Sequence, residues 1–352
     1  MSKKALIAMS GGVDSSVAAA IAKEKGYDCI GVTMNLSTEN VDEKSCCTSK
    51  DIEDARGVAE KLNMPYYVFD FKDDFDNKVV KKFVNTYLDG GTPNPCVDCN
   101  RYIKFEQLMN KMEELGYEYV VTGHYAKVEY NDETKRYILR KGADESKDQS
   151  YVLYSLSQYQ LSHTLFPLGD FSKSEIRNLA IENGFDNAEK KESQDICFVP
   201  DGNYAGFIEK YRNQKSKCGK FVLKDGTVVG KHSGIIRYTI GQRKGLGISY
   251  GKPLFVCSKC IETNTITVGD ECELFSDTLR AGNINLISVE KIEGSMRCKA
   301  KIRYRQKEEW ATVTQEGNEL LVVFDEKQRA IAKGQAVVLY DGDIVIGGGT
   351  IL

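Results

Sequence analysis

The chain has 352 residues, of which 41% are hydrophobic and 28% are charged, and its formal net charge is −3. These values exclude a disordered or fibrous chain and allow two or three globular domains. No apolar run approaches the roughly 20 residues that span a membrane, and the first is too short for a secretory signal, so we expect a cytoplasmic protein without a membrane partner. Its 11 irregularly spaced cysteines favour reactive or metal-binding thiols over a disulfide scaffold.

The first 125 residues alternate predicted strands and helices. The strands are predicted over residues 5–9, 29–36, 66–71 and 119–122, and the helices over 15–25, 49–63, 75–88 and 105–115. Such alternation predicts an α/β fold with a doubly wound parallel sheet, in which ligands lie at the carboxyl ends of the strands.

The rest of the chain is organised differently. A polar loop leads through residues 147–151 into a helical stretch, where Ser172 and Glu175 predict a capping box and Gly184 predicts a helix end. Beyond about residue 205, short alternating segments are separated by turn sequences such as Asp225-Gly226. These segments predict hairpins and an all-β remainder.

The segment Ser-Gly-Gly-Val-Asp-Ser at residues 10–15 directly follows the first predicted strand and opens a helix. Two adjacent glycines allow a tight turn that leaves backbone N–H groups unpaired at the helix start, which suits a phosphate. The segment lacks the Gly-Lys-Ser/Thr of the common P-loop. It resembles instead the PP-loop of ATP pyrophosphatases, which split ATP into AMP and pyrophosphate.

Six motifs together resemble the tRNA-specific 2-thiouridylase (MnmA) family, in the family's order. They are the 10–15 segment, TPNPCVDCN at 92–100, TGHY at 122–125, KDQSY at 147–151, DICF at 195–198 and YTIGQRKG at 238–245. The resemblance implies a PP-loop ATP-binding catalytic domain over residues 1–204. It also implies a small central β-rich domain over 205–275 and a C-terminal antiparallel β-barrel over 276–352, both binding tRNA. The implied enzyme is a tRNA-uridine 2-sulfurtransferase that replaces the C2 oxygen of the wobble uridine with sulfur.

The resemblance also implies roles for single residues. The residues that it implies for ATP binding are Ala8, Met9, Ser10, Gly11, Gly12, Val13, Asp14, Ser15, Met34 and Gly123. Cys99 matches the nucleophile and Cys197 the persulfide carrier, while Asn94, Pro95 and Cys96 match the loop at the target base. The implied tRNA contacts are His124, Lys147, Asp148, Gln149, Arg303, Tyr304 and Gln335.

In the implied reaction, ATP adenylates the C2 oxygen and pyrophosphate departs, with Mg²⁺ assisting and Asp14 as its expected ligand. Sulfur then displaces AMP. In a persulfide relay, Cys99 attacks the inner sulfur on Cys197 and leaves a Cys99–Cys197 disulfide. The sulfur donor is expected to be a cysteine desulfurase, a sulfur-relay protein or sulfide. The sequence does not choose among them.

Cys96 leaves a second mechanism open, because many relatives carry a different residue there, such as Asp. With Cys99 and Cys197 it offers three thiolates for a [4Fe–4S] cluster, as in related iron–sulfur tRNA thiolases. Cys257 and Cys260 are expected to be chance cysteines of a hairpin, and Cys46-Cys47 stays unassigned. Taken alone, the neighbours of Cys197 favour a buried core cysteine.

Two other functions compete with thiolation. One is another PP-loop ligase that acts on a small molecule, which would leave the paired cysteines unexplained. The other is a nucleotide-gated RNA-binding protein with inactive cysteines.

Charge is distributed unevenly along the chain. Residues 1–204 carry 25 Lys and Arg against 34 Asp and Glu, whereas residues 205–352 carry 23 against 17. From 297 to 307 every odd position is basic, which on a strand places six cations on one face and Cys298, Ala300 and Ile302 on the other. We expect phosphate contacts with tRNA along this face.

Overall fold

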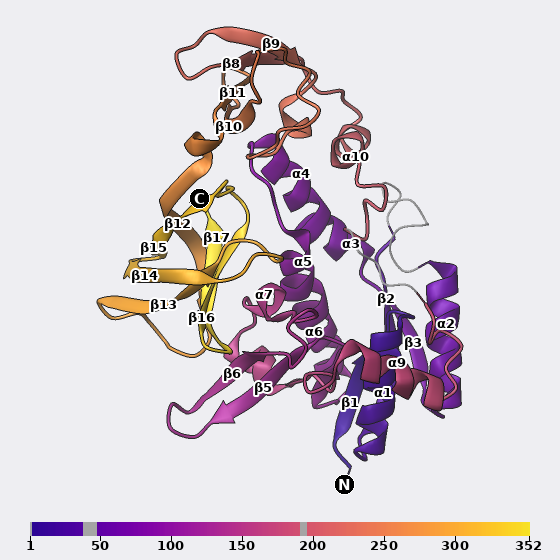
Figure 1. The fold of residues 1–352 in the computed structure, drawn as a ribbon. Helices are drawn as coiled ribbons and strands as arrows, with labels where there is room; N and C mark the ends of the chain where they lie inside the picture. Colours follow the sequence, from indigo (N-terminus) through magenta and orange to yellow (C-terminus); the bar gives the residue numbers. More distant parts are fainter. Residues whose placement is uncertain (1, 38–47, 191–195) are drawn as a thin grey trace.

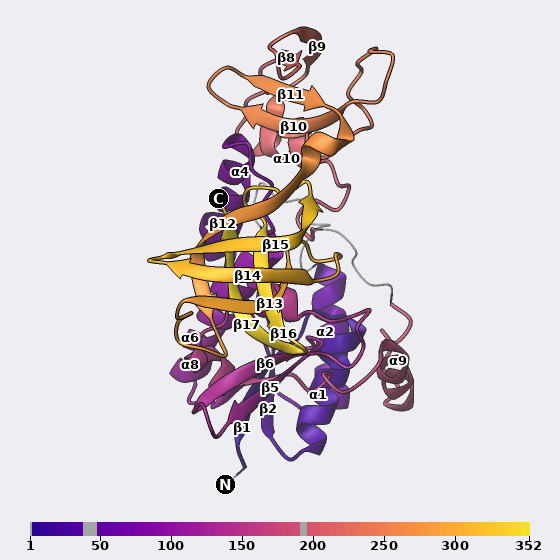
Figure 2. The same ribbon diagram turned by 60° about the vertical axis from the view of Figure 1, so that its left-hand side comes forward.

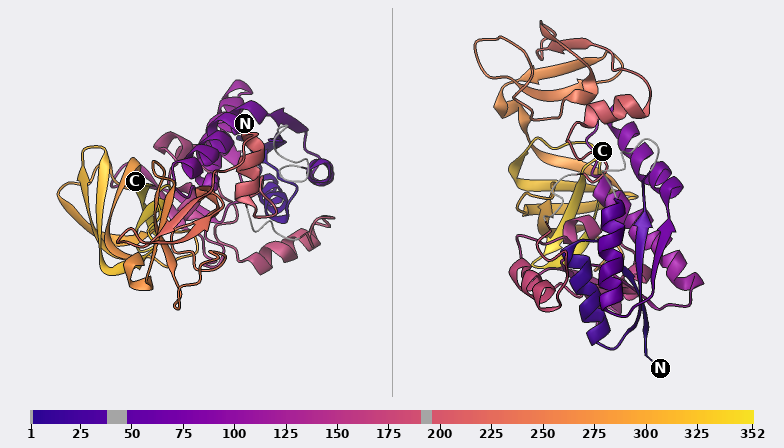
Figure 3. Two further views of the ribbon diagram at one scale, coloured as in Figure 1. Left: turned by 90° about the horizontal axis from the view of Figure 1, so that it is seen from above. Right: turned by 90° about the vertical axis from the view of Figure 1, so that its right-hand side faces the viewer.

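The computed structural model describes residues 2–37, 48–190 and 196–352. Figure 1 shows an α/β part, a small β part and a C-terminal β-barrel, and Figure 3 shows that the small β part lies at one end of the molecule. Within the described ranges, none of the helices has the length and apolar character needed to cross a membrane. The predictions that involve Cys46, Cys47 and Asp195 lie outside the described residues.

The α/β part is built on a parallel sheet, as predicted. Its strand order is β3-β2-β1-β4-β7, and every neighbouring pair is parallel. The strands are β1 (Lys4–Ala8), β2 (Asp28–Asn35), β3 (Tyr66–Asp70), β4 (Tyr119–Val121) and β7 (Thr164–Leu165).

Helices cover both faces of this sheet, which confirms the doubly wound fold. Ala5 and Ile7 of β1 pack on one side, whereas Leu6 and Ala8 pack on the other, because strand side chains alternate. The first side carries α1 (Val13–Glu24), α2 (Ser49–Lys61) and α9 (Lys173–Glu182), and the second carries α4 (Lys81–Leu88), α6 (Leu108–Glu114) and α7 (Ser150–Leu153). Short helices α8 (Gln158–Ser162) and α10 (Tyr204–Tyr211) follow α7 and α9 along the chain.

The predicted end signals of α9 are confirmed. The Ser172 side chain accepts from the Glu175 N–H and the Glu175 carboxylate accepts from the Ser172 N–H. Gly184 follows the helix with a φ of 66°.

Two helical stretches begin earlier than predicted. The first runs through α3 (Lys72–Phe75), η1 (Asp76–Val80) and α4, and the second through α5 (Pro95–Asp98), η2 (Cys99–Gln107) and α6. The predicted start at residue 105 was wrong because the Asn94 side chain caps the helix, accepting from the Cys96 N–H at 3.2 Å. Pro95 then occupies the first helical position, where its missing N–H costs nothing. Cys99 begins a wider π-helical segment, a feature frequent at functional sites.

A hairpin joins the α/β part to the barrel where the sequence predicted a polar loop. Strands β5 (Ala126–Asn131) and β6 (Arg136–Lys141) pair with each other, and β6 pairs with β17 of the barrel. Figure 2 shows this hairpin lying alongside β16 and β17. Leu139 packs with Val338 and Tyr340 in one core that spans both parts. The α/β part and the barrel therefore form one packed unit.

The C-terminal barrel is antiparallel and closed. Its strands follow the order β12-β15-β14-β13-β16-β17, and β12 also pairs with β17. They are β12 (Phe275–Leu286), β13 (Ser295–Lys301), β14 (Glu309–Glu316), β15 (Glu319–Arg329), β16 (Ala336–Asp341) and β17 (Ile344–Ile351).

The small β part contains a four-stranded sheet in the order β10-β11-β8-β9. Its elements are β8 (Gly219–Val222), β9 (Val228–His232), η3 (Ile235–Arg237), β10 (Phe255–Cys260), β11 (Thr265–Gly269) and η4 (Glu271–Leu274). Cys257 and Cys260 both lie on β10, and burial raises the pKa of Cys257 to about 11.

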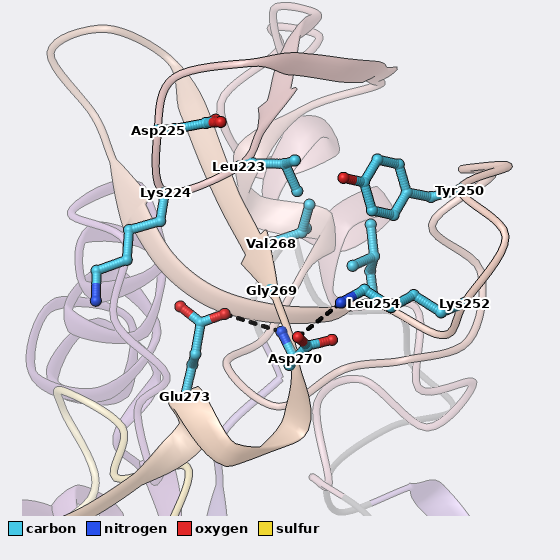
Figure 4. Close-up of a pocket in the computed structure, with 10 residues that line it drawn as sticks. All are labelled: Leu223, Lys224, Asp225, Tyr250, Lys252, Leu254, Val268, Gly269, Asp270 and Glu273. Carbon is cyan, nitrogen blue, oxygen red and sulfur yellow. Dashed lines mark hydrogen bonds and ion pairs between the residues drawn. The ribbon is translucent and has the colours of Figure 1, made fainter.

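A cavity of about 250 Å³ opens on this small β part. Figure 4 shows its lining, in which Lys252 Nζ and an Asp270 carboxylate oxygen form an ion pair at 2.7 Å. The lining residues are Leu223, Lys224, Asp225, Tyr250, Lys252, Leu254, Val268, Gly269, Asp270 and Glu273. None of the residues predicted for ATP, sulfur or tRNA lies in it.

Lys259 lies where β10 meets the end of α4. A side chain at Gly90 would come within 3.7 Å of the Lys259 Cβ, and among the described residues the buried Lys259 Nζ has no hydrogen-bond partner. Burial lowers the pKa of this ammonium to about 8. At neutral pH the fold therefore holds an unpaired charge that water would solvate in the unfolded chain.

We expect Lys259→Met to raise the melting temperature at neutral pH by roughly 2–4 °C. The buried charge destabilises the wild-type fold to its full extent below pH about 8, where Lys259 is charged in both the folded and the unfolded chain. This destabilisation disappears above the ordinary lysine pKa of 10.5, so the rise in melting temperature should shrink as the pH increases from about 8 to 10.5. Thermal melts at several pH values measure it, with the exposed Lys231→Met as control. An equal gain at every pH would show that packing, not charge, is responsible.

Candidate functional site

The 10–15 loop lies at the carboxyl end of β1, in the middle of the sheet. Helix α1 begins at Val13, two residues before the predicted start, and its N-cap residue Gly12 provides no side-chain cap. Ser15 is buried; its Oγ donates to the Gly12 carbonyl at 3.0 Å and accepts from the Ser10 N–H at 3.1 Å. The loop is thus held by its own serines, and the start of α1 offers backbone N–H groups to an anion.

Three strand ends converge on this loop, as the sequence predicted. Met34 is the last residue but one of β2 on one side of β1, and Gly123 lies two residues beyond the end of β4 on the other. A Cβ on Gly123 would lie 2.7 Å from the Asp14 carbonyl carbon, so only glycine allows β4 to approach the loop so closely. Ala8 and Met9 are buried beneath it.

The sequence did not reveal the side chains that hold the loop from outside. Asn187 Nδ2 donates to the Gly11 carbonyl and to Ser16 Oγ, each at 3.0 Å. Lys190 Nζ donates to the same carbonyl at 3.1 Å and pairs with Asp51 and Asp54 of α2, each at 2.6 Å. These contacts join segments more than a hundred residues apart, and no local motif predicts such pairs.

Lys173 is a second residue that the sequence did not reveal. Its Nζ lies 2.7 Å and 2.8 Å from the two carboxylate oxygens of Asp14, and Tyr125 donates its hydroxyl to the same carboxylate at 2.8 Å. Lys173 thus brings a positive charge to the anion site. A Mg²⁺ ion at Asp14 would have to displace this ammonium, so the role of Asp14 as a Mg²⁺ ligand stays a prediction.

We expect Lys173→Met to lower kcat/KM for ATP by about a hundredfold, because a donor at developing phosphate charge is worth that much. Lys173→Arg should restore part of the loss. The control is Lys127→Met, which breaks the nearby Lys127–Asp170 pair of 2.6 Å without touching the loop. Steady-state kinetics at varied ATP measure the effect, and an unchanged ATP dependence in Lys173→Met would exclude Lys173 from the anion site.

The two cysteine segments are both anchored to α4. Lys82 Nζ pairs with Asp98, the residue before Cys99, at 2.6 Å. Phe83 packs its ring on Phe198, the residue after Cys197, with 5.1 Å between centroids. Neighbouring residues of one helix thus hold the chain next to both cysteines.

Solvent reaches these cysteines to different degrees. Cys96 and Cys197 are exposed, and Cys99 is half-buried. The expectation of a buried Cys197 was wrong, because Phe198 takes the core position next to it. Within residues 2–37, 48–190 and 196–352, no group of three or more His, Cys, Asp or Glu side chains could hold a metal ion. The described residues therefore do not assemble the predicted cluster ligands.

Hydrogen bonds join the barrel to the loop that precedes Cys96. The Thr92 N–H donates to the Lys333 carbonyl at 2.7 Å, and Gln335 Nε2 donates to the Thr92 and Pro93 carbonyls at 2.8 Å and 3.3 Å. Gln335, predicted to contact tRNA, thus positions the predicted target-base loop of Asn94, Pro95 and Cys96.

Several other residues predicted to contact tRNA make contacts inside the protein. His124 is buried against Phe105 and Phe166, and burial holds its pKa well below the ordinary value. Asp148 accepts from the Ser150 N–H at 3.1 Å, and Gln149 accepts from the Tyr125 N–H at 3.0 Å. Their predicted role stays a prediction, as does that of half-exposed Lys147.

The basic segment follows the predicted pattern only in part. Cys298, Ala300 and Ile302 are buried, and Arg297, Lys299 and Lys301 lie on the opposite face of β13. The strand ends at Lys301, so the expectation of six cations on one strand face was wrong. Arg303 is half-buried and donates to the Ala330 carbonyl, while Tyr304 and Arg305 are exposed.

Comparisons with known proteins agree along the entire chain. Family models match in succession: the tRNA methyl transferase HUP domain at residues 3–201, its PRC-barrel domain at 205–270 and the aminomethyltransferase β-barrel domain at 276–351. The chain is 50% identical to the tRNA-specific 2-thiouridylase MnmA of Clostridioides difficile (strain 630), over 100% of this chain and 98% of that protein. It is 50% identical to that of Acetivibrio thermocellus, over 99% of each, and 51% identical to MnmA 1 of Thermoanaerobacter sp. (strain X514), over 99% and 97%. The chain therefore belongs to the tRNA-specific 2-thiouridylase family.

Proposed function

We propose that this protein is a tRNA-uridine 2-sulfurtransferase that uses ATP to convert the wobble uridine of tRNA to 2-thiouridine. The observation that carries the proposal is the pairing of an anion site at the 10–15 loop with two cysteine segments anchored to one helix. Family membership over the full length supports the same activity.

The first step activates the uridine. The C2 oxygen attacks the α-phosphorus of ATP, pyrophosphate leaves, and the oxygen becomes a leaving group as part of AMP. The backbone N–H groups at the start of α1 and the ammonium of Lys173 are suited to stabilise the charge that develops on the pyrophosphate. Ser10, Gly11, Gly12 and Ser15 supply the close backbone approach that this step needs.

The second step transfers sulfur. The terminal sulfur of a persulfide on Cys197 attacks C2, and AMP departs with the former C2 oxygen. The Cys99 thiolate then attacks the inner sulfur, which is the Sγ of Cys197. The bond between this sulfur and the sulfur on C2 breaks, so 2-thiouridine is released and a Cys99–Cys197 disulfide remains. An external thiol must reduce this disulfide, after which a cysteine desulfurase or a relay protein that carries sulfane sulfur must supply the next sulfur. Sulfide serves the relay only by attacking the disulfide itself, which leaves a persulfide on Cys197 and a thiolate on Cys99.

A [4Fe–4S] cluster on Cys96, Cys99 and Cys197 is the second candidate for sulfur delivery. Cys96 and Cys99 are one helical turn apart, which favours joint ligation, but the described residues do not bring three such ligands together. Anaerobic purification followed by iron and sulfide assays separates the two mechanisms. Active protein without iron supports the relay, whereas activity that follows iron content supports the cluster.

An isotope experiment tests the activation step. Transfer RNA labelled with heavy oxygen at C2 of the wobble uridine should yield AMP that carries the label. Unlabelled AMP would mean that ATP activates another group, as expected of a ligase that acts on a small molecule. Absence of ATP turnover with tRNA would instead favour a nucleotide-gated RNA-binding protein.

A further inference from the structure

The one tryptophan of the chain stands on the outer face of the barrel. Trp310 lies near the start of β14 and is 49% exposed, whereas its strand neighbours Ala311 and Val313 are buried in the barrel interior. A single exposed apolar side chain is ordinary by itself. Trp310 is informative because of the side chains that lie over its ring.

Cations surround this ring. The Arg297 guanidinium carbon lies 5.1 Å from the ring centroid, and Lys299, directly opposite Trp310 in the β13–β14 register, has its Nζ 5.6 Å away. Asp325 holds Arg297 with a hydrogen bond of 2.6 Å. Two residues further along β13, Lys301 Nζ lies 5.8 Å from the ring of Tyr304, which is 37% exposed. We call Arg297, Lys299, Lys301, Tyr304 and Trp310 the Trp310 platform.

The platform is connected to the loop before Cys96. The rings of Tyr304 and Tyr151 have centroids 6.0 Å apart, and the Tyr151 hydroxyl donates to the Ala336 carbonyl at 2.8 Å. The neighbouring Gln335 donates to the Thr92 carbonyl. A chain bound along the platform would therefore lead toward the predicted target-base loop.

We propose that the Trp310 platform binds unpaired nucleotides of the RNA substrate, with a base stacked on Trp310 and phosphates near Lys299 and Lys301. An aromatic ring stacks on any base, and interleaved cations neutralise the adjoining phosphates, which is the usual composition of a single-strand binding surface. The ammonium groups of Lys299 and Lys301 beside exposed rings fit a polyanion that carries bases better than an apolar protein surface. This inference rests on the proposed function, because it takes the substrate to be tRNA.

The single tryptophan makes a direct test available without labels. Emission excited where tyrosine does not absorb reports on Trp310 alone, because no other residue of the chain is a tryptophan. Added tRNA or oligouridine should quench this emission until it saturates, and the concentration at half-maximal quenching should equal the dissociation constant measured independently by filter binding. Heparin, a polyanion without bases, should leave the emission unchanged. Unchanged emission at saturating tRNA, or an equal quench by heparin, would overturn the proposal.

Variants supply the second arm. Trp310→Ala should weaken tRNA binding by about ten- to hundredfold, whereas Trp310→Tyr should retain most of the affinity. Tyr130→Ala is the matched control, since Tyr130 is 48% exposed and belongs to the same continuous sheet. Wild-type affinity in Trp310→Ala would overturn the platform while leaving the proposed function intact. A wild-type protein that binds no tRNA would remove both.

Discussion

Replacing Cys99 or Cys197 with serine is expected to lower 2-thiouridine formation more than about a thousandfold, because a hydroxyl can neither carry a persulfide nor attack one efficiently. Cys96→Ser should keep activity close to that of the wild type if the persulfide relay operates. Mass spectrometry of nucleosides from tRNA incubated with each variant, ATP and a sulfur source measures the outcome.

The intermediates distinguish the two cysteines. In a single turnover Cys99→Ser should trap the tRNA on Cys197 through a covalent S–S link and still release one pyrophosphate and one AMP, whereas Cys197→Ser should accept no sulfur. Retained thiolation in both variants would contradict the relay. Equal loss in all three cysteine variants, together with loss of bound iron, would favour the cluster instead.

Gly11→Ala is expected to raise the KM for ATP by at least about a hundredfold, since it displaces the backbone that faces the anion site. Gly11 has a φ of 70°, and a Cβ there would lie 2.2 Å from the Asp51 carbonyl oxygen, far inside contact distance. The loop or the start of α2 must therefore move. Isothermal titration with ATP and steady-state kinetics measure the result.

Gly26→Ala is the matched control for this variant. Gly26 has a φ of 82°, but a Cβ there would meet no atom within 4 Å. Both variants should lose about 1 kcal/mol of stability from backbone strain, and only Gly11→Ala should lose affinity for ATP. Equal ATP affinity in the two would show that the 10–15 loop is not the nucleotide site.

The sequence predicted the parts of the fold that depend on local pattern. The parallel sheet followed from alternating apolar strands and helices, and the 10–15 loop followed from two glycines between a strand and a helix. The Ser172–Glu175 cap and the end of α9 near Gly184 are also short-range signals. Because the carboxyl ends of parallel strands meet at one edge, the same pattern brought Met34 and Gly123 to the loop.

The features that the sequence did not predict depend on contacts between residues far apart in the chain. Lys173 and Lys190 reach the 10–15 loop from more than a hundred residues away. The β5–β6 hairpin looked like a polar loop because one of its partners, β17, lies at the other end of the chain. The basic alternation beyond Lys301 matched a strand, yet β13 ends there and Arg303 donates to the carbonyl of Ala330, the residue after β15.

The most direct measurement of the central claim is the reaction itself. Purified protein is incubated with unmodified tRNA, ATP and sulfide or a cysteine desulfurase with cysteine, and both the nucleosides and the nucleotide products are quantified. We predict 2-thiouridine at the wobble position, with one AMP and one pyrophosphate for each thiouridine formed. Hydrolysis of ATP to ADP and phosphate, or formation of AMP without 2-thiouridine, would contradict the proposed thiolation reaction.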